Sequence, residues 1–112
     1  MRMVISTLPE QTLEDFAKEH GLKMMVFERE PSMTREPRAL SRYFCYFHSL
    51  EMKAGGMLTS ESGNGDSIDE AIVNYVENIS RKKAVYKATS PTERKEISIP
   101  VLRAYWTMEE IK

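Results

Sequence analysis

The sequence has few of the features that mark secreted, membrane or metal-binding proteins. Its 112 residues hold one cysteine, Cys45, so an internal disulfide is excluded and nothing indicates a disulfide-stabilised secreted fold. It contains no run of the ~18 apolar residues that a membrane helix requires. Residues 1–7 turn polar too early for a secretory signal. We therefore expect a protein of the reducing cytoplasm that has no membrane contact.

Residues that could carry chemistry are also few. His20 and His48 do not form a metal-ligand spacing with Cys45, and His48 would lie on the opposite face of a strand from Cys45. Two histidines without a nucleophile elbow do not support a Ser-His-Asp arrangement. Cys45 stands in an aromatic stretch, which favours a buried, inert thiol over a nucleophile. The sequence therefore predicts a non-enzymatic protein with no catalytic residue, metal site or cofactor.

What is present predicts one globular domain over residues 1–112. The sequence is 41% hydrophobic and 29% charged, which is ordinary for such a domain. A chain of this length buries enough surface to fold without metals or disulfides. We expect two irregular segments. One is a long loop over residues 29–42, which holds Pro31 and Pro37, and the other is a C-terminal segment over residues 101–112 that is mobile or frayed.

Two helices are predicted from their ends and their spacing. The first begins at Thr12, with Asp15 completing an approximate capping box, and ends at Gly21. The second begins with a full capping box formed by Ser67 and Glu70. Its apolar stripe consists of Ile68, Ala71, Ile72, Tyr75, Val76 and Ile79. This stripe at helical spacing predicts that the second helix packs on a sheet, with Ile72 and Tyr75 beside an aromatic strand.

Strands are predicted between the two helices and after the second. They lie at residues 22–28, 42–53, 57–61, 84–86 and 96–100. Within the stretch 42–53, residues 43–47 are aromatic or apolar on both faces, as in a central strand, and Ala54-Gly55-Gly56 joins the stretch to its neighbour as a tight hairpin. Pro100 closes the last strand, which places it at a sheet edge. The order α-β-β-β-α-β-β predicts an α+β two-layer sandwich, an antiparallel sheet with helices on one face.

Gly63-Asn64-Gly65 precedes the second helix and allows two interpretations. Backbone N–H groups at such a turn could hold an anion, but Asp66 and Asp69 would repel a phosphate there. The glycine pattern is also too short for a P-loop or a dinucleotide fingerprint. We therefore expect a strand-to-helix turn in which the glycines supply positive φ.

Charge is distributed unevenly along the chain. Residues 41–80 carry 2 basic and 6 acidic side chains (2 − 6 = −4), whereas residues 81–112 carry 8 and 4 (8 − 4 = +4). The candidate partner-binding residues are Arg81, Lys82, Lys83, Lys87, Arg94, Lys95, Tyr105 and Trp106. Basic residues can bind a charged partner, and exposed aromatic residues can anchor an interface. The alternatives are that the cations solvate a helix end and that both aromatic side chains dock on the sheet.

The second half of the chain resembles small uncharacterised proteins encoded by tailed bacteriophages. These share a hairpin, a glycine-containing turn, a helix of pattern "EAI..Y...IS.K" and a terminal "R.EI.VP" strand. In this sequence the patterns read Glu70-Ala71-Ile72, Tyr75, Ile79-Ser80 and Lys82, and then Arg94-Lys95-Glu96-Ile97-Ser98-Ile99-Pro100. The β-β-β-α core is also similar to HicB-type antitoxins, which use a partial double-stranded-RNA-binding fold.

The phage resemblance implies a non-enzymatic accessory protein in the bacterial host cytoplasm. Such a protein would bind and inhibit or modulate a host factor, either a defence system, as anti-CRISPR proteins do, or a nucleic-acid enzyme. Its partner would be a host protein or a nucleoprotein complex. A nucleic-acid-binding module, a small-ligand or enzymatic domain, and a homodimer stay open as alternatives. Asp66 and Asp69 stand where RNA-binding members of the HicB-type fold carry basic residues, which favours a protein partner.

Overall fold

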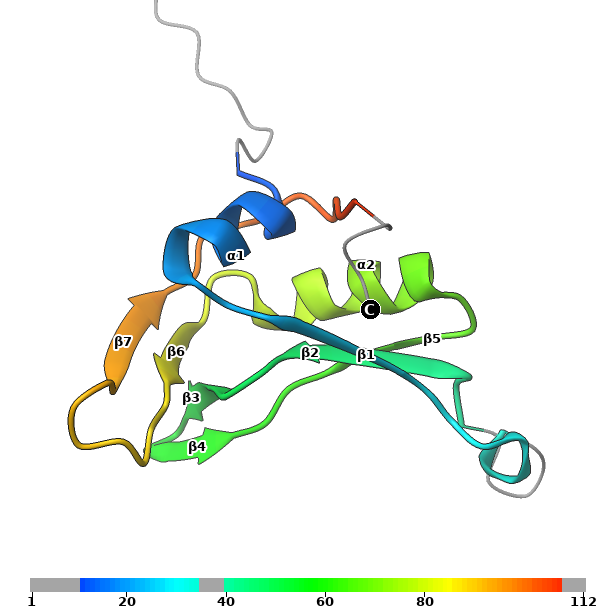
Figure 1. The fold of residues 1–112 in the computed structure, drawn as a ribbon, viewed down its shortest axis with the longest axis horizontal. Helices are drawn as coiled ribbons and strands as arrows, with labels where there is room; N and C mark the ends of the chain where they lie inside the picture. The colour runs from blue at the N-terminus through cyan, green and yellow to red at the C-terminus, as the bar shows by residue number, and fades with distance from the viewer. Residues whose placement is uncertain (1–10, 35–39, 108–112) are drawn as a thin grey trace, which may run out of the picture.

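The computed structural model describes residues 11–34 and 40–107, which form two helices and seven strands in two antiparallel sheets (Figure 1). The elements are α1 (Leu13–His20), β1 (Met24–Glu28), the 3-10 turn η1 (Pro31–Met33), β2 (Tyr43–Phe47), β3 (Leu50–Ala54), β4 (Met57–Thr59), β5 (Gly63–Gly65), α2 (Ile68–Ile79), β6 (Lys83–Tyr86) and β7 (Lys95–Ser98). The strand orders are β1-β2-β5 and β4-β3-β6-β7. The predicted α+β class is confirmed, and β7 lies at a sheet edge as expected.

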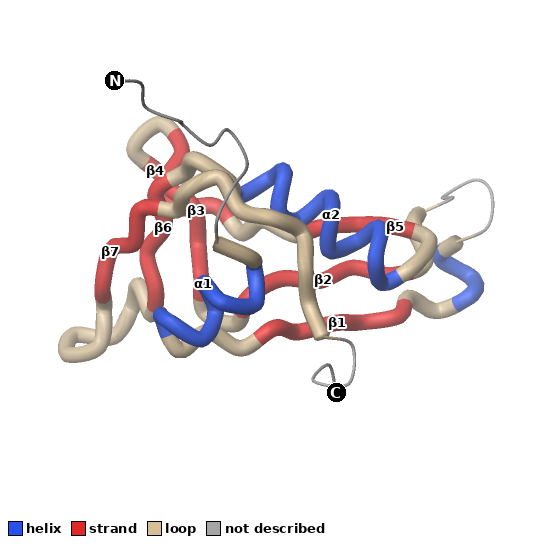
Figure 2. The backbone as a smooth tube through the Cα atoms, turned by 90° about the horizontal axis from the view of Figure 1, so that it is seen from above, coloured by secondary structure: helices blue, strands red, loops and turns tan. Residues whose placement is uncertain are grey.

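Both helices lie on the same side of the molecule. Figure 2, which looks down on that side, shows α2 over β2 and β5, and α1 where the two sheets meet. Phe47 of β2 connects the layers, because its ring centroid lies 6.4 Å from that of Phe16 in α1 and 5.5 Å from that of Tyr75 in α2. Ile72 and Tyr75 are buried in this core, which confirms their predicted packing on the aromatic strand.

The predicted strand over residues 42–53 is two strands separated by a bend. Cys45 pairs with Gly63, and Met52 pairs with Thr59. Between these two pairings the chain advances seven positions from Cys45 to Met52 (52 − 45 = 7) but only four from Thr59 to Gly63 (63 − 59 = 4). The additional residues include a turn at residues 48 and 49, where Ser49 has φ 64°. The turn ends β2 at Phe47, and β3 begins at Leu50 in the other sheet. The prediction of one continuous strand is therefore wrong, because the apolar pattern of residues 43–47 does not reveal where the chain turns.

The bend transfers the chain from one sheet to the other. Before it, the backbone N–H of His48 donates to the carbonyl of Lys23 beside β1, at 2.9 Å. After it, the N–H of Lys87 beside β6 donates to the carbonyl of Ser49, also at 2.9 Å. The single predicted sheet is thus divided into two, with β2 in one and β3 in the other.

The predicted helix ends are observed with one difference. The Thr12 hydroxyl accepts from the N–H of Asp15, and Gly21 ends α1 in the left-handed conformation. The Ser67 hydroxyl accepts from the N–H of Glu70 at 3.1 Å, which confirms the cap of α2. The carboxylate of Glu70 accepts at 2.7 Å from the N–H of Asp66 rather than from that of Ser67. The capping box therefore closes one residue earlier than expected.

Gly63 and Gly65 are needed for a different reason from the one predicted. Neither has positive φ; both lie in β5, directly beneath α2. A Cβ at Gly63 would collide with the carbonyl of Ala71 and the backbone N of Tyr75. The glycines therefore allow the helix to rest on the strand backbone, and the prediction of a positive-φ turn is wrong.

The segment after β7 is held against α1 over its described part. Arg103 forms a parallel bridge with Thr12, and Leu102 is buried in the core. The backbone N–H and the hydroxyl of Thr107 donate to the carboxylate of Glu14 at 3.3 and 2.9 Å. Residues 101–107 thus belong to the packed structure, and 108–112 lie outside the described residues.

Candidate functional site

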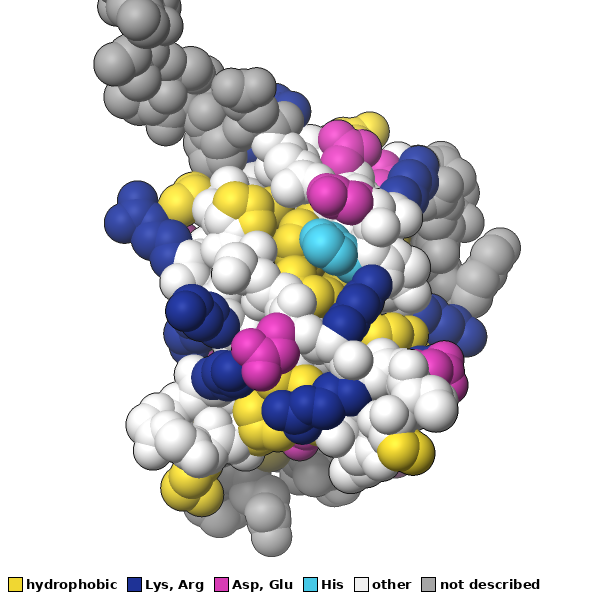
Figure 3. Space-filling model, turned by 90° about the vertical axis from the view of Figure 1, so that its left-hand side faces the viewer, with side chains coloured by type: hydrophobic (Ala, Val, Ile, Leu, Met, Phe, Trp, Pro, Cys, Tyr) yellow, Lys and Arg dark blue, Asp and Glu magenta, His cyan; other side chains and the backbone are white. Residues whose placement is uncertain are grey.

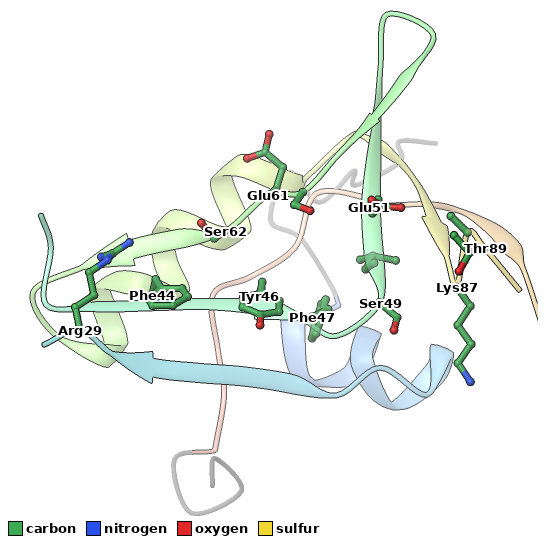
Figure 4. A pocket seen from close by; sticks show the side chains of 13 residues that line it. Arg29, Phe44, Tyr46, Phe47, Ser49, Glu51, Glu61, Ser62, Lys87 and Thr89 are labelled. Atoms are coloured by element: carbon green, nitrogen blue, oxygen red, sulfur yellow. The ribbon is translucent and has the colours of Figure 1, made fainter. Parts of the chain in front are cut away.

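The side of the three-stranded sheet that faces away from α2 carries a row of aromatic side chains. In β2, Phe44 and Tyr46 alternate with the buried Cys45 and Phe47, so they point to the opposite side of the sheet. Phe27 of β1 is the register partner of Phe44 and lies on the same side. We call Phe27, Phe44 and Tyr46 the aromatic face. In the part of the chain that the structure describes, no helix covers it, and Figure 4 shows Phe44 and Tyr46 in front of the sheet with α2 behind.

The rings of the aromatic face form one ordered array. The centroid of Phe27 lies 5.3 Å from that of Phe44 and 5.9 Å from that of Tyr46, with interplanar angles of 22° and 19°. Phe44 and Tyr46 are 6.3 Å apart at 16°. Phe27 is 39% exposed, and the other two are half-buried. Nearly parallel rings on an open sheet present a rigid apolar surface to a partner.

Arg29, just after β1, extends over this array. Its Cζ lies 4.6 Å from the centroid of Phe44. Its Nη1 donates to the carbonyl of Ser41 and its Nη2 to the side-chain oxygen of Asn64, both at 2.6 Å. Contacts on three sides hold the guanidinium in one orientation, so a cation is fixed on the aromatic face.

A pocket of about 570 Å³ continues from the aromatic face to the bend between the sheets (Figure 4). Its lining residues are Arg29, Phe44, Tyr46, Phe47, Ser49, Leu50, Glu51, Ser60, Glu61, Ser62, Lys87, Ala88 and Thr89. The bend creates this hollow, because β3 and β6 leave the plane of β2 there. It lies within the size range of small-ligand and peptide-anchoring pockets.

Two charges at the far end of the pocket already have partners. Lys87 Nζ lies 2.7 Å from Glu93, whose hydrogen bond raises the pKa of Lys87. Glu61 lies 3.4 Å from Lys82 Nζ. Glu51 has no ion pair within the described residues. The pocket therefore has the Arg29 cation at one end and, across aromatic side chains, two paired charges and the Glu51 carboxylate toward the other.

The structure separates the predicted basic residues into two groups. Arg81, Lys82 and Lys83 lie where α2 leads into β6, whereas Lys87, Arg94 and Lys95 lie at the opposite end of β6 and β7. Figure 3 shows Lys and Arg side chains gathered at this end of the molecule, with carboxylates between them. Three of the six have carboxylate partners: Lys82 with Glu61, Lys87 with Glu93, and Arg94 with Glu96.

The predicted aromatic pair has two different environments. Tyr105 is 56% exposed, so its placement is compatible with an interface. Trp106 packs on the core, with its ring centroid 6.2 Å from that of Phe47. Its indole N–H is buried without a hydrogen-bond partner among the described residues. For Trp106 the structure favours the docked alternative.

The thiol of Cys45 is buried, as expected. Cys45 is 0% exposed, and burial raises the pKa of its thiol to about 12, which disfavours the reactive thiolate. Within residues 11–34 and 40–107, no group of His, Cys, Asp and Glu has the arrangement that a metal ion needs. Neither described helix is long and apolar enough to cross a membrane.

The aromatic face is not among the predicted site residues. The sequence predicts apolar side chains on both faces of residues 43–47 and places Arg29 in the loop over 29–42. Alternate positions in an aromatic strand do not reveal which face a helix will cover. The available signal was the number of helices, since two short helices on one side leave the other side of the sheets uncovered.

Comparisons with protein-family models, with curated proteins and with solved structures give no match for this chain.

Proposed function

We propose that this protein is a non-enzymatic binding protein that uses the aromatic face to bind a bacterial host protein and to inhibit or modulate it. The observation that carries the proposal is the array of Phe27, Phe44 and Tyr46 on an uncovered sheet, with Arg29 fixed above it. Aromatic residues and arginine are the types that contribute most to interface energies. The bacterial host partner follows from the phage resemblance.

The basic residues between α2 and β6 have a separate role in this proposal. Exposed lysines change the rate of association more than the stability of a complex. Arg81, Lys82 and Lys83 would therefore steer the partner, while the aromatic face would hold it.

The test compares two variants in affinity capture from bacterial lysate, followed by binding kinetics with the captured protein. Phe27→Ser combined with Tyr46→Ser should abolish capture, because it removes the apolar contact surface. Replacing Arg81, Lys82 and Lys83 together with Gln should preserve capture but slow association and reduce its dependence on salt. Thermal melts control for folding. If the folded aromatic-face variant still captures the same protein as the parent, the aromatic face is not the binding surface.

The second candidate function is binding of single-stranded nucleic acid. The same array favours it, because bases stack on aromatic side chains that stand on an open sheet. Glu51, which lines the pocket without an ion pair among the described residues, opposes it, since its carboxylate repels phosphates. A fluorescent oligothymidine and a duplex RNA, titrated at two salt concentrations, separate the two functions. Binding to either that weakens with salt and needs Tyr46 would favour nucleic acid.

A further inference from the structure

Among the described residues, Arg29 differs from the neighbouring Arg42 in having no carboxylate partner. Arg42 lies 2.7 Å from the carboxylate of Glu28, which raises the pKa of Arg42. Both acceptors of Arg29, the Ser41 carbonyl and the Asn64 amide oxygen, are neutral. Among the described residues no carboxylate lies within ion-pair distance of Arg29. Within the described part of the chain, this half-buried guanidinium on the aromatic face is thus not paired with a carboxylate.

The way Arg29 is held leaves part of its guanidinium available. One hydrogen bond from Nη1 and one from Nη2 use only some of its N–H groups, and Nε–H has no acceptor in the described structure. The contact with the Phe44 ring and the two hydrogen bonds together restrict the orientation of the group. A planar, oriented guanidinium is suited to a carboxylate, which it can bind through two parallel hydrogen bonds.

The rest of the site determines what kind of molecule carries that carboxylate. Next to Arg29 lies the apolar surface of Phe44 and Tyr46, which suits an apolar or aromatic side chain. Glu51 follows at the far end of the pocket without an ion pair among the described residues, and its carboxylate would repel a phosphate. A protein segment can place one acidic side chain on Arg29 and neutral or basic residues further along, whereas a nucleic acid cannot.

We propose that Arg29 anchors an Asp or Glu side chain of a linear partner segment, with an adjacent apolar or aromatic residue of that segment on Phe44 and Tyr46. This rests on the proposed function, because it names the chemistry of the partner that the aromatic face binds. Arg29 is the specificity-determining residue of the site, and the aromatic rings supply the contact area.

The experiment is selection of random linear peptides against the full chain, followed by titration of an enriched peptide. We expect enriched sequences to share an acidic residue close to an aromatic or large aliphatic residue. Changing that acid to its amide should weaken binding at least about tenfold, since a charged hydrogen-bonded pair is lost. This change leaves the protein untouched, so folding does not affect it.

Protein variants then assign the acid to Arg29. Arg29→Gln should cause the same loss, and Arg29→Glu should prefer the peptide in which Lys replaces the acid. Arg42→Gln is the matched control, because Arg42 is ion-paired with Glu28 and does not line the pocket, and it should bind like the parent. Melting temperatures show which variants are folded. If Arg29→Gln is unfolded, the comparison of the acidic peptide with its amide form on the parent protein decides the test instead.

The outcomes separate this proposal from the proposed function. Peptides that bind through Tyr46 without an acidic requirement would overturn the role of Arg29 and leave the aromatic face as the binding surface. Enrichment of no peptide, or peptide binding that survives both Arg29→Gln and the amide change, also overturns the anchor. Oligothymidine binding that depends on Arg29 and Tyr46 would overturn the protein segment in favour of nucleic acid.

Discussion

At the scale of single residues, Tyr75 shows how one polar atom completes the core. Its hydroxyl accepts the backbone N–H of Phe47 at 2.9 Å, deep inside the protein, and burial raises its pKa. The ladder between β2 and β5 ends at Cys45 and Gly63, so this N–H has no strand partner at the bend. The tyrosine hydroxyl takes the place of the missing carbonyl.

Tyr75→Phe should therefore destabilise the protein by about 1–3 kcal/mol, because it leaves a buried donor unsatisfied while preserving the ring. Urea unfolding measures the change. The control is Tyr86→Phe, a half-buried tyrosine whose hydroxyl has no hydrogen-bond partner among the described residues, and it should stay within about 0.5 kcal/mol. Equal effects of the two variants would contradict the role given to the Tyr75 hydroxyl.

At the scale of elements, the contact between α2 and β5 depends on glycine. Two asparagines of α2 also reach this strand: the side-chain amide of Asn74 donates to the carbonyl of Asn64, and that of Asn78 to the carbonyl of Ser62. These bonds satisfy carbonyls on the outer edge of β5, which would otherwise be open to pairing with another chain. Helix and strand thus form one unit.

Gly63→Ala should cost at least about 2 kcal/mol, because its Cβ would displace the helix backbone. The sign of the change in unfolding free energy is informative, because replacing glycine by alanine at an ordinary strand position stabilises a protein. Gly55→Ala is the comparison, because Gly55 has φ +56° but open space around it. Thermal and urea unfolding of both should show the larger loss at Gly63, and a smaller loss there would mean that the helix shifts easily.

At the scale of the whole molecule, the bend at Ser49 determines how the two sheets meet and where the pocket lies. Ser49 holds a left-handed conformation that β-branched residues disfavour. Ser49→Val should therefore destabilise the protein by about 1–3 kcal/mol, whereas Ser49→Gly should be neutral or slightly stabilising. Chemical denaturation checks both. Equal stability of the two variants would show that the bend does not depend on this dihedral angle.

The sequence by itself determined those features that depend on neighbouring residues. Capping residues set the helix starts at Thr12 and Ser67, because a hydroxyl and an N–H only three positions apart meet within one turn. The glycine pair Gly55 and Gly56 produced the predicted hairpin, since both have positive φ. The apolar stripe of α2 predicted its buried face for the same local reason.

Only the tertiary structure decided the features that depend on distant residues. The role of Gly63 is set by a helix that begins after it, and the burial of Trp106 by Phe47, far away in the chain. Alternation in β2 showed two faces but not which one the helices would cover, so Phe44 and Tyr46 could not be distinguished from core residues. Arg29 became part of a site only when folding brought Phe44 and Asn64 beside it, because charge and aromatic rings from separate strands combine through packing alone.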